Sequence, residues 1–374
     1  MKVVVVIPTY NERENIKRLI PLLEKEYEHF SNHEIHTLIV DGNSPDGTGE
    51  EVEGFKEQYP NVWLLREKEK AGLGAAYVYG FRHAMKEMGA EVVVEMDADF
   101  QHDPKDLTSM LQKFDEGYDY IIGSRYIKGG SVPKEWAFYR KFLSLGGSWF
   151  SKLVLGIFNV NDFTTGFKIS RVKGYLDRLD LDGINSSGFA YKIDLLYKMH
   201  RVGAKIVEVP IKFGLRDRGD SKMEKDNMMD SLRVVVLLRY EESKSFLKFL
   251  LVGLAGLIAD GGVFSLLRLT SVGSSWASAI SGFVGMVTTF SLNNVWSFKE
   301  RKIESRKKMI KSFVVYFASS YVPIIFRSWL IDFSIGKYGE GALVEYTAFS
   351  IGILVGLVWN YTVYSRLIWK KDSK

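Results

Sequence analysis

The sequence predicts an α/β domain with a doubly wound parallel sheet, followed by an all-α membrane domain of four helices. Three observations support this prediction. Short β-branched runs alternate with segments of helical periodicity up to about residue 240. Polar clusters follow the ends of several of these runs, where α/β sheets bind ligands. Long apolar segments dominate from about residue 245 onward, and 374 residues are enough for both domains.

The first run, Val3 to Ile7, is apolar and ends at Pro8, which is typical of a buried parallel strand. Similar runs predict further strands at Thr37 to Val40, Val62 to Leu65, Glu91 to Met96 and Tyr120 to Ile122. Apolar residues at helical spacing predict helices over Asn11 to Glu28 and Gly72 to Met88. No internal repeat is evident in the sequence.

Composition excludes several function classes. The net charge of +5 is mild, and no basic stripe interleaved with aromatic residues indicates nucleic-acid binding. The chain has no cysteine, which excludes disulfides, thiolate chemistry and cysteine-based zinc sites. The apolar N-terminal run is too short for a signal peptide, so we expect the first domain to lie in the cytosol.

The second half contains four apolar segments, 246–268, 276–297, 311–335 and 342–365, each long enough to cross a membrane. The loop after the second segment and the C-terminus are rich in Lys and Arg, whereas the loop after the third is acidic. The positive-inside rule then places both termini in the cytoplasm. We therefore expect a cytosolic domain at 1–243 and a transmembrane domain at 244–374; the alternative is a hydrophobic soluble bundle.

Two stretches of the first domain, near 134–158 and 226–243, mix apolar and aromatic residues with Arg and Lys. Such a composition suits helices that lie in the membrane interface. The same pattern also fits core helices of the soluble domain.

The motif Asp97-Ala98-Asp99 directly follows a predicted buried strand. Alternate residues of an extended segment point the same way, so both carboxylates can face one ligand. They form a partial shell for Mg²⁺ or Mn²⁺, which would complete its coordination with phosphate oxygens and water. Gln101 and His102 are close enough to help. The position at a strand end favours this interpretation over a solvated turn.

Two other strand ends carry polar motifs. Pro8, Tyr10 and Glu12 could hold a nucleotide base and ribose, although Asn11 could equally be a helix cap. Asp41 opens a run of turn-forming residues that could hydrogen-bond the same ligand or form an Asx turn. Guanidinium groups suit phosphate because their planar fork binds two oxygens. The candidate phosphate-binding cations are Arg125, Arg140, Arg216, Arg218 and Lys222.

These residues together resemble glycosyltransferase family 2, which has the GT-A fold, and more narrowly the dolichyl-phosphate (polyprenyl-phosphate) mannose synthases. The resemblance covers residues 1 to about 240. It runs through 7–12, 44–48, 96–102, 123–126, 165–167 and 218–222. Residues 245–370 resemble the GtrA-like membrane module of some of these synthases, with Phe290 to Asn294 and Trp296 to Phe298 as markers.

The resemblance implies a role for each candidate residue. Asp97, Asp99 and Gln101 would hold the metal, and Asp97, Asp99, Arg125 and Arg140 would act in catalysis. Arg125, Arg140 and Ser144 would bind the lipid phosphate acceptor. The nucleotide sugar would contact Pro8, Tyr10, Glu12, Asp41, Asp97, Arg218 and Lys222.

The implied reaction moves mannose from GDP-mannose to dolichyl or polyprenyl phosphate with inversion. An ionised acceptor phosphate needs no general base, so the reaction needs only charge stabilisation and alignment. One departure affects the donor: the family usually has two adjacent acids after the second strand, and here the pair is Asp41-Gly42. The alternatives are transfer from UDP-glucose and, in another class, a non-catalytic membrane scaffold or lipid carrier.

Overall fold

The computed structural model describes residues 1–215 and 225–370. The chain folds into two compact units, Met1–Arg239 and Tyr240–Lys374.

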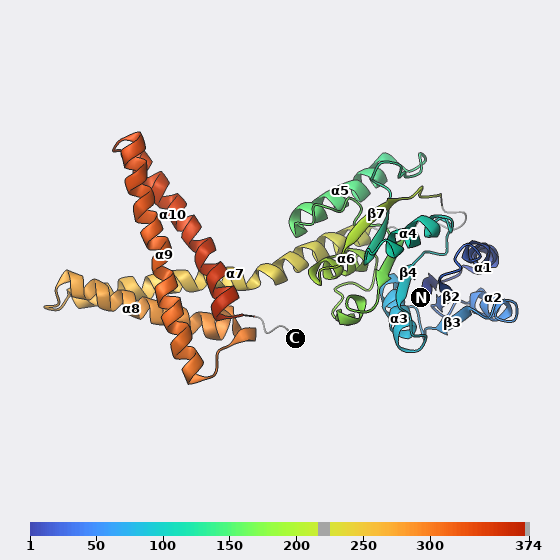
Figure 1. The fold of residues 1–374 in the computed structure, drawn as a ribbon, viewed down its shortest axis with the longest axis horizontal. Helices are drawn as coiled ribbons and strands as arrows, with labels where there is room; N and C mark the ends of the chain where they lie inside the picture. The colour runs from blue at the N-terminus through green and yellow to red at the C-terminus, as the bar shows by residue number, and fades with distance from the viewer. Residues whose placement is uncertain (216–224, 371–374) are drawn as a thin grey trace. The chain divides into compact units, whose positions relative to one another are not determined.

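The first unit is built on a seven-stranded sheet with the order β3-β2-β1-β4-β6-β5-β7 (Figure 1). Every strand runs parallel to its neighbours except β6, which is antiparallel to both β4 and β5. All five strands predicted from the sequence are present, and β6 and β7 are additional. The strands are β1 Lys2–Thr9, β2 Glu34–Asp41, β3 Val62–Arg66, β4 Val92–Glu95, β5 Tyr120–Ser124, β6 Lys168–Arg171 and β7 Ile206–Pro210.

Helices cover both faces of this sheet. Alternate β1 residues point to opposite sides, so that Val4 packs in one core with α3 while Val5 packs in the other with α1 and α4. Because both faces are buried, β1 and most of β4 are apolar without alternation. The helices are α1 Arg13–Tyr27, α2 Thr48–Phe55, α3 Leu73–Lys86, α4 Asp106–Asp115, α5 Phe138–Leu155, η1 Leu176–Arg178 and α6 Tyr191–Arg201.

The loops that follow β1, β2 and β4 share an uncommon backbone conformation. Asn11, Asn43 and Phe100 have φ angles of 58°, 58° and 62°. Asparagine tolerates this left-handed region, but a phenylalanine adopts it only at a cost. Backbone strain of this kind concentrates at functional sites, and it marks the edge of the sheet where the polar motifs lie.

The four predicted membrane segments each form a helix. These are α7 Lys225–Arg268, α8 Ser274–Leu292, α9 Arg306–Tyr338 and α10 Ala342–Val363. The helices α7, α9 and α10 contain spans long and apolar enough to cross a membrane, whereas α8, rich in Ser, Thr and Gly, is not among them. Short π-helical turns continue α8 and α10, η2 at Asn293–Ser297 and η4 at Tyr364–Ile368, and the short η3 turn follows at Lys299–Arg301.

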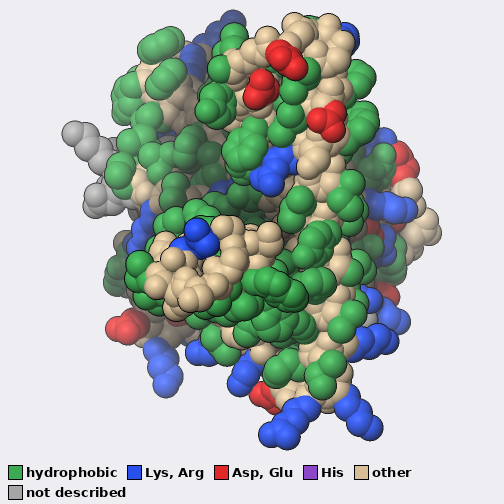
Figure 2. Space-filling view, turned by 90° about the vertical axis from the view of Figure 1, so that its left-hand side faces the viewer, with side chains coloured by type: hydrophobic (Ala, Val, Ile, Leu, Met, Phe, Trp, Pro, Cys, Tyr) green, Lys and Arg blue, Asp and Glu red, His purple; other side chains and the backbone are tan. Residues whose placement is uncertain are grey.

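The surface of this second unit, in the foreground of Figure 2, is mainly hydrophobic. Lys and Arg gather at its lower edge, and acidic side chains lie at its upper edge. The side chains of Arg306, Lys307 and Lys308 at the start of α9 are exposed, and so are those of Glu340 and Glu345 near the start of α10. An apolar surface with charge of one sign at one edge suits a membrane-spanning unit.

Candidate functional site

The loop after β4 holds the Asp97-Ala98-Asp99 motif in a defined shape. The backbone N–H of Asp97 donates to His102 Nδ1 at 3.1 Å, and that of Gln101 donates to Asp99 Oδ1 at 3.1 Å. The segment after β7 is hydrogen-bonded to this loop, since the Gly214 N–H donates to the Gln101 carbonyl at 2.9 Å. The loop is therefore fixed at both ends before any ligand binds.

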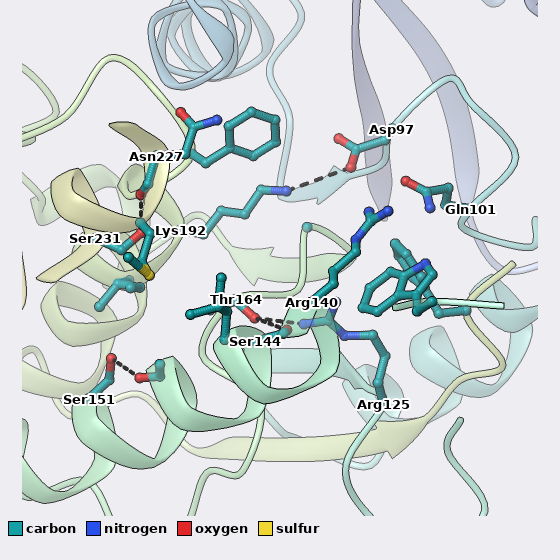
Figure 3. A pocket seen from close by; sticks show the side chains of 18 of the residues that line it. Asp97, Gln101, Arg125, Arg140, Ser144, Ser151, Thr164, Lys192, Asn227 and Ser231 are labelled. Atoms are coloured by element: carbon teal, nitrogen blue, oxygen red, sulfur yellow. Dashed lines mark hydrogen bonds and ion pairs between the residues drawn. The ribbon is translucent and has the colours of Figure 1, made fainter. Parts of the chain in front are cut away.

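Three side chains surround the Asp97 carboxylate. Tyr77, on α3, donates a hydrogen bond from its Oη to Asp97 Oδ1 at 2.9 Å. The Lys192 ammonium lies 3.6 Å from Oδ2, and His102 Nε2 lies 4.0 Å from the same oxygen. Figure 3 shows Lys192 extending from α6 toward Asp97. The side chain of Lys192 is only 5% exposed, so its charge acts in a poorly hydrated site.

Asp97, Asp99 and Gln101 offer oxygen atoms from one short loop, which suits a hard divalent cation. Within 1–215 and 225–370, no group of three or more His, Asp or Glu side chains converges on one point. Mg²⁺ commonly binds through one or two carboxylates together with phosphate oxygens and water. The donor set therefore fits a metal that is shared with a phosphate-bearing ligand.

His102 is neutral in this arrangement. Its Nδ1 accepts the Asp97 N–H, which assigns the proton to Nε2, and its ring stacks on Phe167 at 5.0 Å. Burial lowers the pKa of His102, and the nearby Asp97 charge only partly opposes this effect. His102 is among the residues that line a neighbouring cavity, and its buried Nε2 has no hydrogen-bond partner among the described residues. It can therefore donate a hydrogen bond to a ligand.

A buried polar layer lies beneath this loop. Tyr191 Oη donates to Glu95 Oε2 at 2.8 Å, and Lys168 Nζ donates to the Lys192 carbonyl at 2.8 Å. Burial lowers the pKa of Lys168 to about 8, against the attraction of Glu95. The side chains of Glu95 and Lys168 are both fully buried. This layer fixes the start of α6 and hence the base of the Lys192 side chain.

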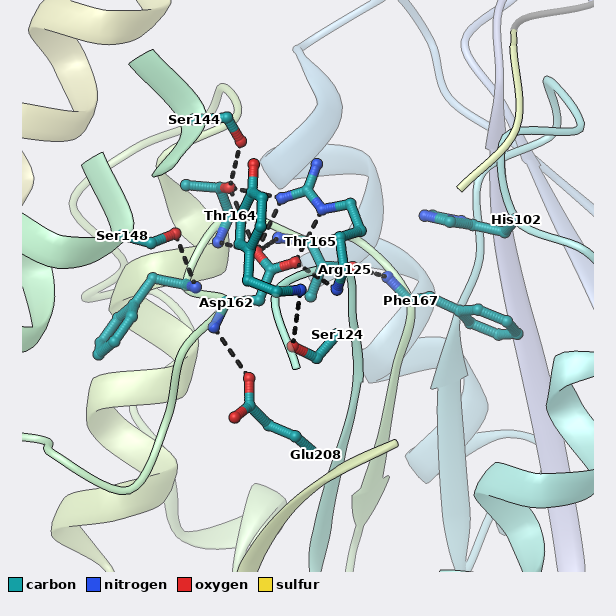
Figure 4. A network of polar contacts seen from close by, with 12 residues as sticks. His102, Ser124, Arg125, Ser144, Ser148, Asp162, Thr164, Thr165, Phe167 and Glu208 are labelled. Atoms are coloured by element: carbon teal, nitrogen blue, oxygen red, sulfur yellow. Dashed lines mark hydrogen bonds and ion pairs between the residues drawn. The ribbon is translucent and has the colours of Figure 1, made fainter. Parts of the chain in front are cut away.

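Arg125 follows β5 and is held by Asp162 (Figure 4). Arg125 Nε and Nη2 donate to the two Asp162 oxygens, each at 2.7 Å, and the Arg125 N–H donates to Oδ2 at 3.0 Å. Burial would lower the pKa of Arg125, but Asp162 raises it, so the guanidinium stays charged. Nη2 also donates to Thr164 Oγ1 at 2.7 Å. The arginine is thus oriented rigidly.

The helix α5 brings two further predicted residues to this point. The guanidinium of Arg140 lies over the Trp136 ring at 4.0 Å and extends into the space beside Asp97 (Figure 3). Ser144 is buried, and its Oγ lies 3.2 Å from Thr164 Oγ1, the atom that Arg125 also contacts. Arg125, Arg140 and Ser144 are therefore grouped around one position.

A cavity of about 140 Å³ connects these groups. One end is polar and includes Asp97, Arg125, Arg140 and Lys192. The other end runs between α5 and the start of α7 and is mainly apolar. Its lining there is Leu143, Gly147, Ser151, Ile193, Met228, Ser231, Leu232 and Val235. The cavity can accommodate a molecule with an anionic head and an apolar chain.

The loops after β1 and β2 are tied together by Asp41. Its carboxylate is fully buried and accepts hydrogen bonds from Thr9 Oγ1 at 3.0 Å and from Ser44 Oγ at 2.6 Å. Asp41 therefore supports the two loops. Glu12 is part-buried and accepts from Asn15 Nδ2 at 2.6 Å.

Tyr10 lies at the end of β1, after the half-buried Pro8, with the Lys70 ammonium 4.1 Å from the centre of its ring. A Cβ built on Gly42 would lie 3.4 Å from Tyr10 Cδ2 and 3.5 Å from Glu67 Oε2. The carboxylate of Glu67, just beyond β3, thus occupies space that the side chain of an acid at position 42 would share.

The structure brings Asp97, Gln101, Arg125, Arg140 and Ser144 to one cavity, together with the neighbouring Asp99. Pro8, Tyr10, Glu12 and Asp41 belong to adjacent loops at the same edge of the sheet but do not line it. Arg216, Arg218 and Lys222 lie outside the described residues. Sequence reasoning missed Lys192, Asp162, Thr164 and Glu67. The one signal in the sequence that Lys192 could be a buried functional residue is its position between Tyr191 and Ile193.

Comparison with known proteins gives two family matches. The model of glycosyl transferase family 2 matches residues 4–179, and that of the GtrA/DPMS transmembrane domain matches residues 248–369. The chain is 32% identical to a dolichol-phosphate mannosyltransferase of Pyrococcus furiosus over 99% of both chains.

Two further relatives match about three fifths of the chain. A polyprenol monophosphomannose synthase of Mycolicibacterium smegmatis is 38% identical over 62% of this chain and 84% of its own length. An undecaprenyl-phosphate mannosyltransferase of Micrococcus luteus is 39% identical over 60% of this chain and 88% of its own length.

Proposed function

Because this chain belongs to glycosyl transferase family 2 and joins that domain to a GtrA/DPMS transmembrane domain, we propose that it transfers mannose from GDP-mannose to dolichyl or polyprenyl phosphate. The chain is a glycosyltransferase and a membrane protein. The donor, the inversion at the anomeric carbon, the metal and the cytoplasmic position of the catalytic unit and both termini belong to the proposal.

The observation that supports this function most directly is the polarity of the cavity. Three cations, Arg125, Arg140 and Lys192, lie at the end next to Asp97, and apolar side chains follow between α5 and α7. A polyprenyl phosphate has the same distribution, with an anionic head and a long apolar tail. Its phosphate would bind Arg125 and Arg140, and its first prenyl units would lie along the apolar end.

In the proposed reaction a phosphate oxygen of the acceptor attacks the anomeric carbon of mannose. The bond from that carbon to the diphosphate breaks, and GDP leaves with the electron pair. Attack opposite to the leaving group inverts the anomeric carbon. The acceptor phosphate is ionised near pH 7 and brings its own nucleophilic oxygen, so no side chain has to remove a proton.

The side chains supply alignment and charge stabilisation. Asp97, Asp99 and Gln101 would hold Mg²⁺ or Mn²⁺, which would neutralise negative charge on the leaving diphosphate. Arg125, fixed by Asp162, would orient the acceptor phosphate without losing further conformational freedom. Lys192 places a second positive charge close to the same diphosphate, and the N–H of His102 is available to one of its oxygens.

The exposed face of α5 supports the membrane position of this unit. Phe138, Phe142 and Trp149 are 83%, 64% and 65% exposed, and the neighbouring Arg140 and Lys141 are basic. An apolar face beside basic residues is typical of helices that lie in a membrane interface. The acceptor could then reach the cations while its tail stays in the bilayer.

A donor and acceptor panel tests the proposal. Membranes that contain the full chain are incubated with radiolabelled GDP-mannose, UDP-glucose or GDP-glucose and with dolichyl or undecaprenyl phosphate. We expect labelled lipid only with GDP-mannose and a divalent metal. Asp99→Ala should abolish transfer at unchanged expression and membrane insertion, whereas Asp115→Ala on α4 should not. Transfer at a normal rate in Asp99→Ala, or labelling from UDP-glucose alone, would refute the assignment.

A further inference from the structure

A second cavity lies within the membrane unit. Its volume is about 370 Å³, within the range of roughly 300 to 1,000 Å³ that is typical of small-molecule sites. All residues that line it belong to the helical hairpins α7–α8 and α9–α10 or their π-helical ends.

The two hairpins contribute equivalent residues to this cavity. When Gly285 of α8 is aligned with Gly356 of α10, the lining residues Met286, Thr289 and Asn293 fall on Leu357, Asn360 and Tyr364. When Gly256 of α7 is aligned with Pro323 of α9, Phe249 and Gly253 fall on Tyr316 and Ser320. The five pairs of residues matched in this way all line the cavity.

Other contacts in the membrane unit also match between the hairpin α7–α8 and the hairpin α9–α10. Gly285 packs against Gly256, and its counterpart Gly356 packs against Pro323. The π-helical turn η2 corresponds to η4, and the residues that follow them, Phe298 and Trp369, stack on each other at 4.8 Å. The unit is therefore an approximate two-fold repeat of a helical hairpin. Membrane transport proteins bind ligands at such repeat interfaces, and here the cavity lies there.

Several polar residues that line the cavity are hydrogen-bonded to one another, and two further acceptor atoms have no partner among the described residues. Asn293 is hydrogen-bonded to Tyr316, whose Oη donates to Thr289 Oγ1 at 2.8 Å. Asn293 is 1% exposed, yet its Oδ1 has no hydrogen-bond partner among the described residues. Asn360 Oδ1 also has no hydrogen-bond partner among them. A buried acceptor without a partner costs about 1–3 kcal/mol. Asn293 and Asn360 both line the cavity, and their amide groups favour a ligand with polar hydrogen-bonding groups such as hydroxyls.

Arg327 supplies the one charged group among the described lining residues. Its guanidinium lies over the Phe349 ring at 4.9 Å, and no carboxylate of the described chain forms an ion pair with it. Its stem passes close to α10 at Gly352, where a Cβ would lie 2.6 Å from Arg327 Cγ. An arginine inside an apolar helix is costly, and such residues usually serve a ligand or a pathway.

We propose that this cavity binds a lipid phosphodiester whose headgroup carries hydroxyl groups. Arg327 binds the phosphate, and Asn293 and Asn360 accept hydrogen bonds from the hydroxyls. A glycosyl phosphate on a polyprenyl chain and an inositol phospholipid share this chemistry. The inference does not depend on the proposed reaction, because the cavity is formed by the membrane unit alone.

Binding to the full-length protein in detergent tests the inference, with citronellyl phosphomannose and dioctanoyl phosphatidylinositol as the two lipid sources. Dioctanoyl phosphatidate lacks the hydroxyls, and dioctanoylglycerol lacks the phosphate. We expect Arg327→Met to weaken binding of the first two lipids at least tenfold. Asn360→Leu should weaken them while leaving phosphatidate unchanged. The matched control is Arg268→Met, which alters an exposed arginine at the end of α7.

Lipid that still binds to Arg327→Met is bound in the cavity of the first unit. The difference in binding between the wild type and Arg327→Met therefore measures binding to the cavity of the membrane unit. The more tightly bound lipid identifies the source. Equal affinity in wild type and Arg327→Met, or equal binding of dioctanoylglycerol, would overturn the inference. If Arg327→Met does not fold, photo-crosslinking of a diazirine-labelled phosphatidylinositol to the wild type replaces it. Cross-links should then map to α9 and α10, and their absence there would equally overturn the inference.

Discussion

The ammonium of Lys192 lies 3.6 Å from the carboxylate of Asp97, and the side chain that carries it is nearly buried. A lysine at this place partly neutralises the aspartate and leaves positive charge at the polar end of the cavity. A diphosphate drawn to Asp97 through a metal would meet this charge. The pair thus connects the proposed metal site with the cations that would bind the acceptor.

Substitution of Lys192 should affect the chemical step more than folding. In Lys192→Met the stem is retained and the charge is lost, so stabilisation of the leaving diphosphate falls. We expect kcat to fall about 100-fold, in line with the loss of one preorganised electrostatic contact. Steady-state transfer assays measure it, with Lys113→Met, an exposed lysine on α4, as the control. An unchanged kcat would exclude a role for the charge.

Gly166 keeps the space between Lys192 and Asp97 open. A Cβ at this position would lie 3.0 Å from Asp97 Oδ2 and would overlap the Lys192 ammonium. We therefore expect Gly166→Ala to reduce transfer about 100-fold by displacing the lysine. Gly146→Ala on α5, where a new Cβ meets no atom within 4 Å, should leave transfer unchanged. Equal effects of the two substitutions would contradict the close contact at Gly166.

The pair Arg125–Asp162 should be essential for stability. Both side chains are buried, so Asp162→Asn leaves a buried guanidinium without its counter-charge. Loss of one partner of such a pair costs about 3–5 kcal/mol. Thermal unfolding should show a large fall in Tm for Asp162→Asn. Glu116→Gln, which removes the exposed partner of Lys113, should change the free energy of unfolding by less than about 1 kcal/mol. Similar effects of both would show that Asp162 is not a critical counter-ion.

Periodicity was enough to predict five of the six parallel strands, since β1, β2 and β4 contain apolar runs that end at polar motifs, but it did not predict β7, which is parallel to β5. It missed β6, because Lys168 and Ser170 are polar residues that the structure buries. The charge of Lys168 is compensated by Glu95 and by the Lys192 carbonyl, which are distant in the sequence. A strand that buries a charged residue lacks the pattern of apolar residues from which strands are predicted.

The site was predicted where the residues lie on one strand end, as at Asp97 to Gln101. Lys192 and Asp162 reach it from a distant helix and loop, so that only the fold shows their proximity. The repeat in the membrane unit was also missed. Its two halves share only scattered residue identities, such as Gly285 with Gly356 and Phe246 with Phe313, and equivalent positions such as Asn293 and Tyr364 differ in chemistry.

Asp106 predicts a pH dependence of stability. Burial raises the pKa of its carboxyl to about 6, and the nearby Asp103 adds to this effect. Because the folded pKa exceeds the unfolded one, the stabilisation from protonation is complete below about pH 4. It is lost as the pH rises through about 6. Asp106→Asn should therefore raise the free energy of unfolding at pH 7.5 but not at pH 4.

The expected gain is about 1 kcal/mol, since the side chain is only partly buried and water reduces the penalty. Thermal unfolding of both proteins at pH 4, 6 and 7.5 measures it. A gain of the same size at every pH would show that the charge of Asp106 is not its cause.

Glu67 is the residue that we expect to read the donor base. Resemblance to the family places a second acid after Asp41, and here position 42 is a glycine with Glu67 Oε2 beside it. Burial raises the pKa of Glu67, and the charge of Asp41 adds to this effect. A carboxylate next to Tyr10 can accept hydrogen bonds from the N–H groups of a guanine. Glu67→Gln should therefore raise the KM for GDP-mannose about tenfold with little change in kcat.

Relocation of the acid provides the sharper test. Gly42→Asp alone should weaken donor binding, because two carboxylates would then share one space. The double variant Gly42→Asp/Glu67→Gln restores a single acid and should recover most of the wild-type KM. Competition between GDP-mannose and UDP-glucose in each protein measures base selectivity directly. If the double variant is weaker than both single variants by the sum of their effects, the two positions act independently and Glu67 does not replace the missing acid.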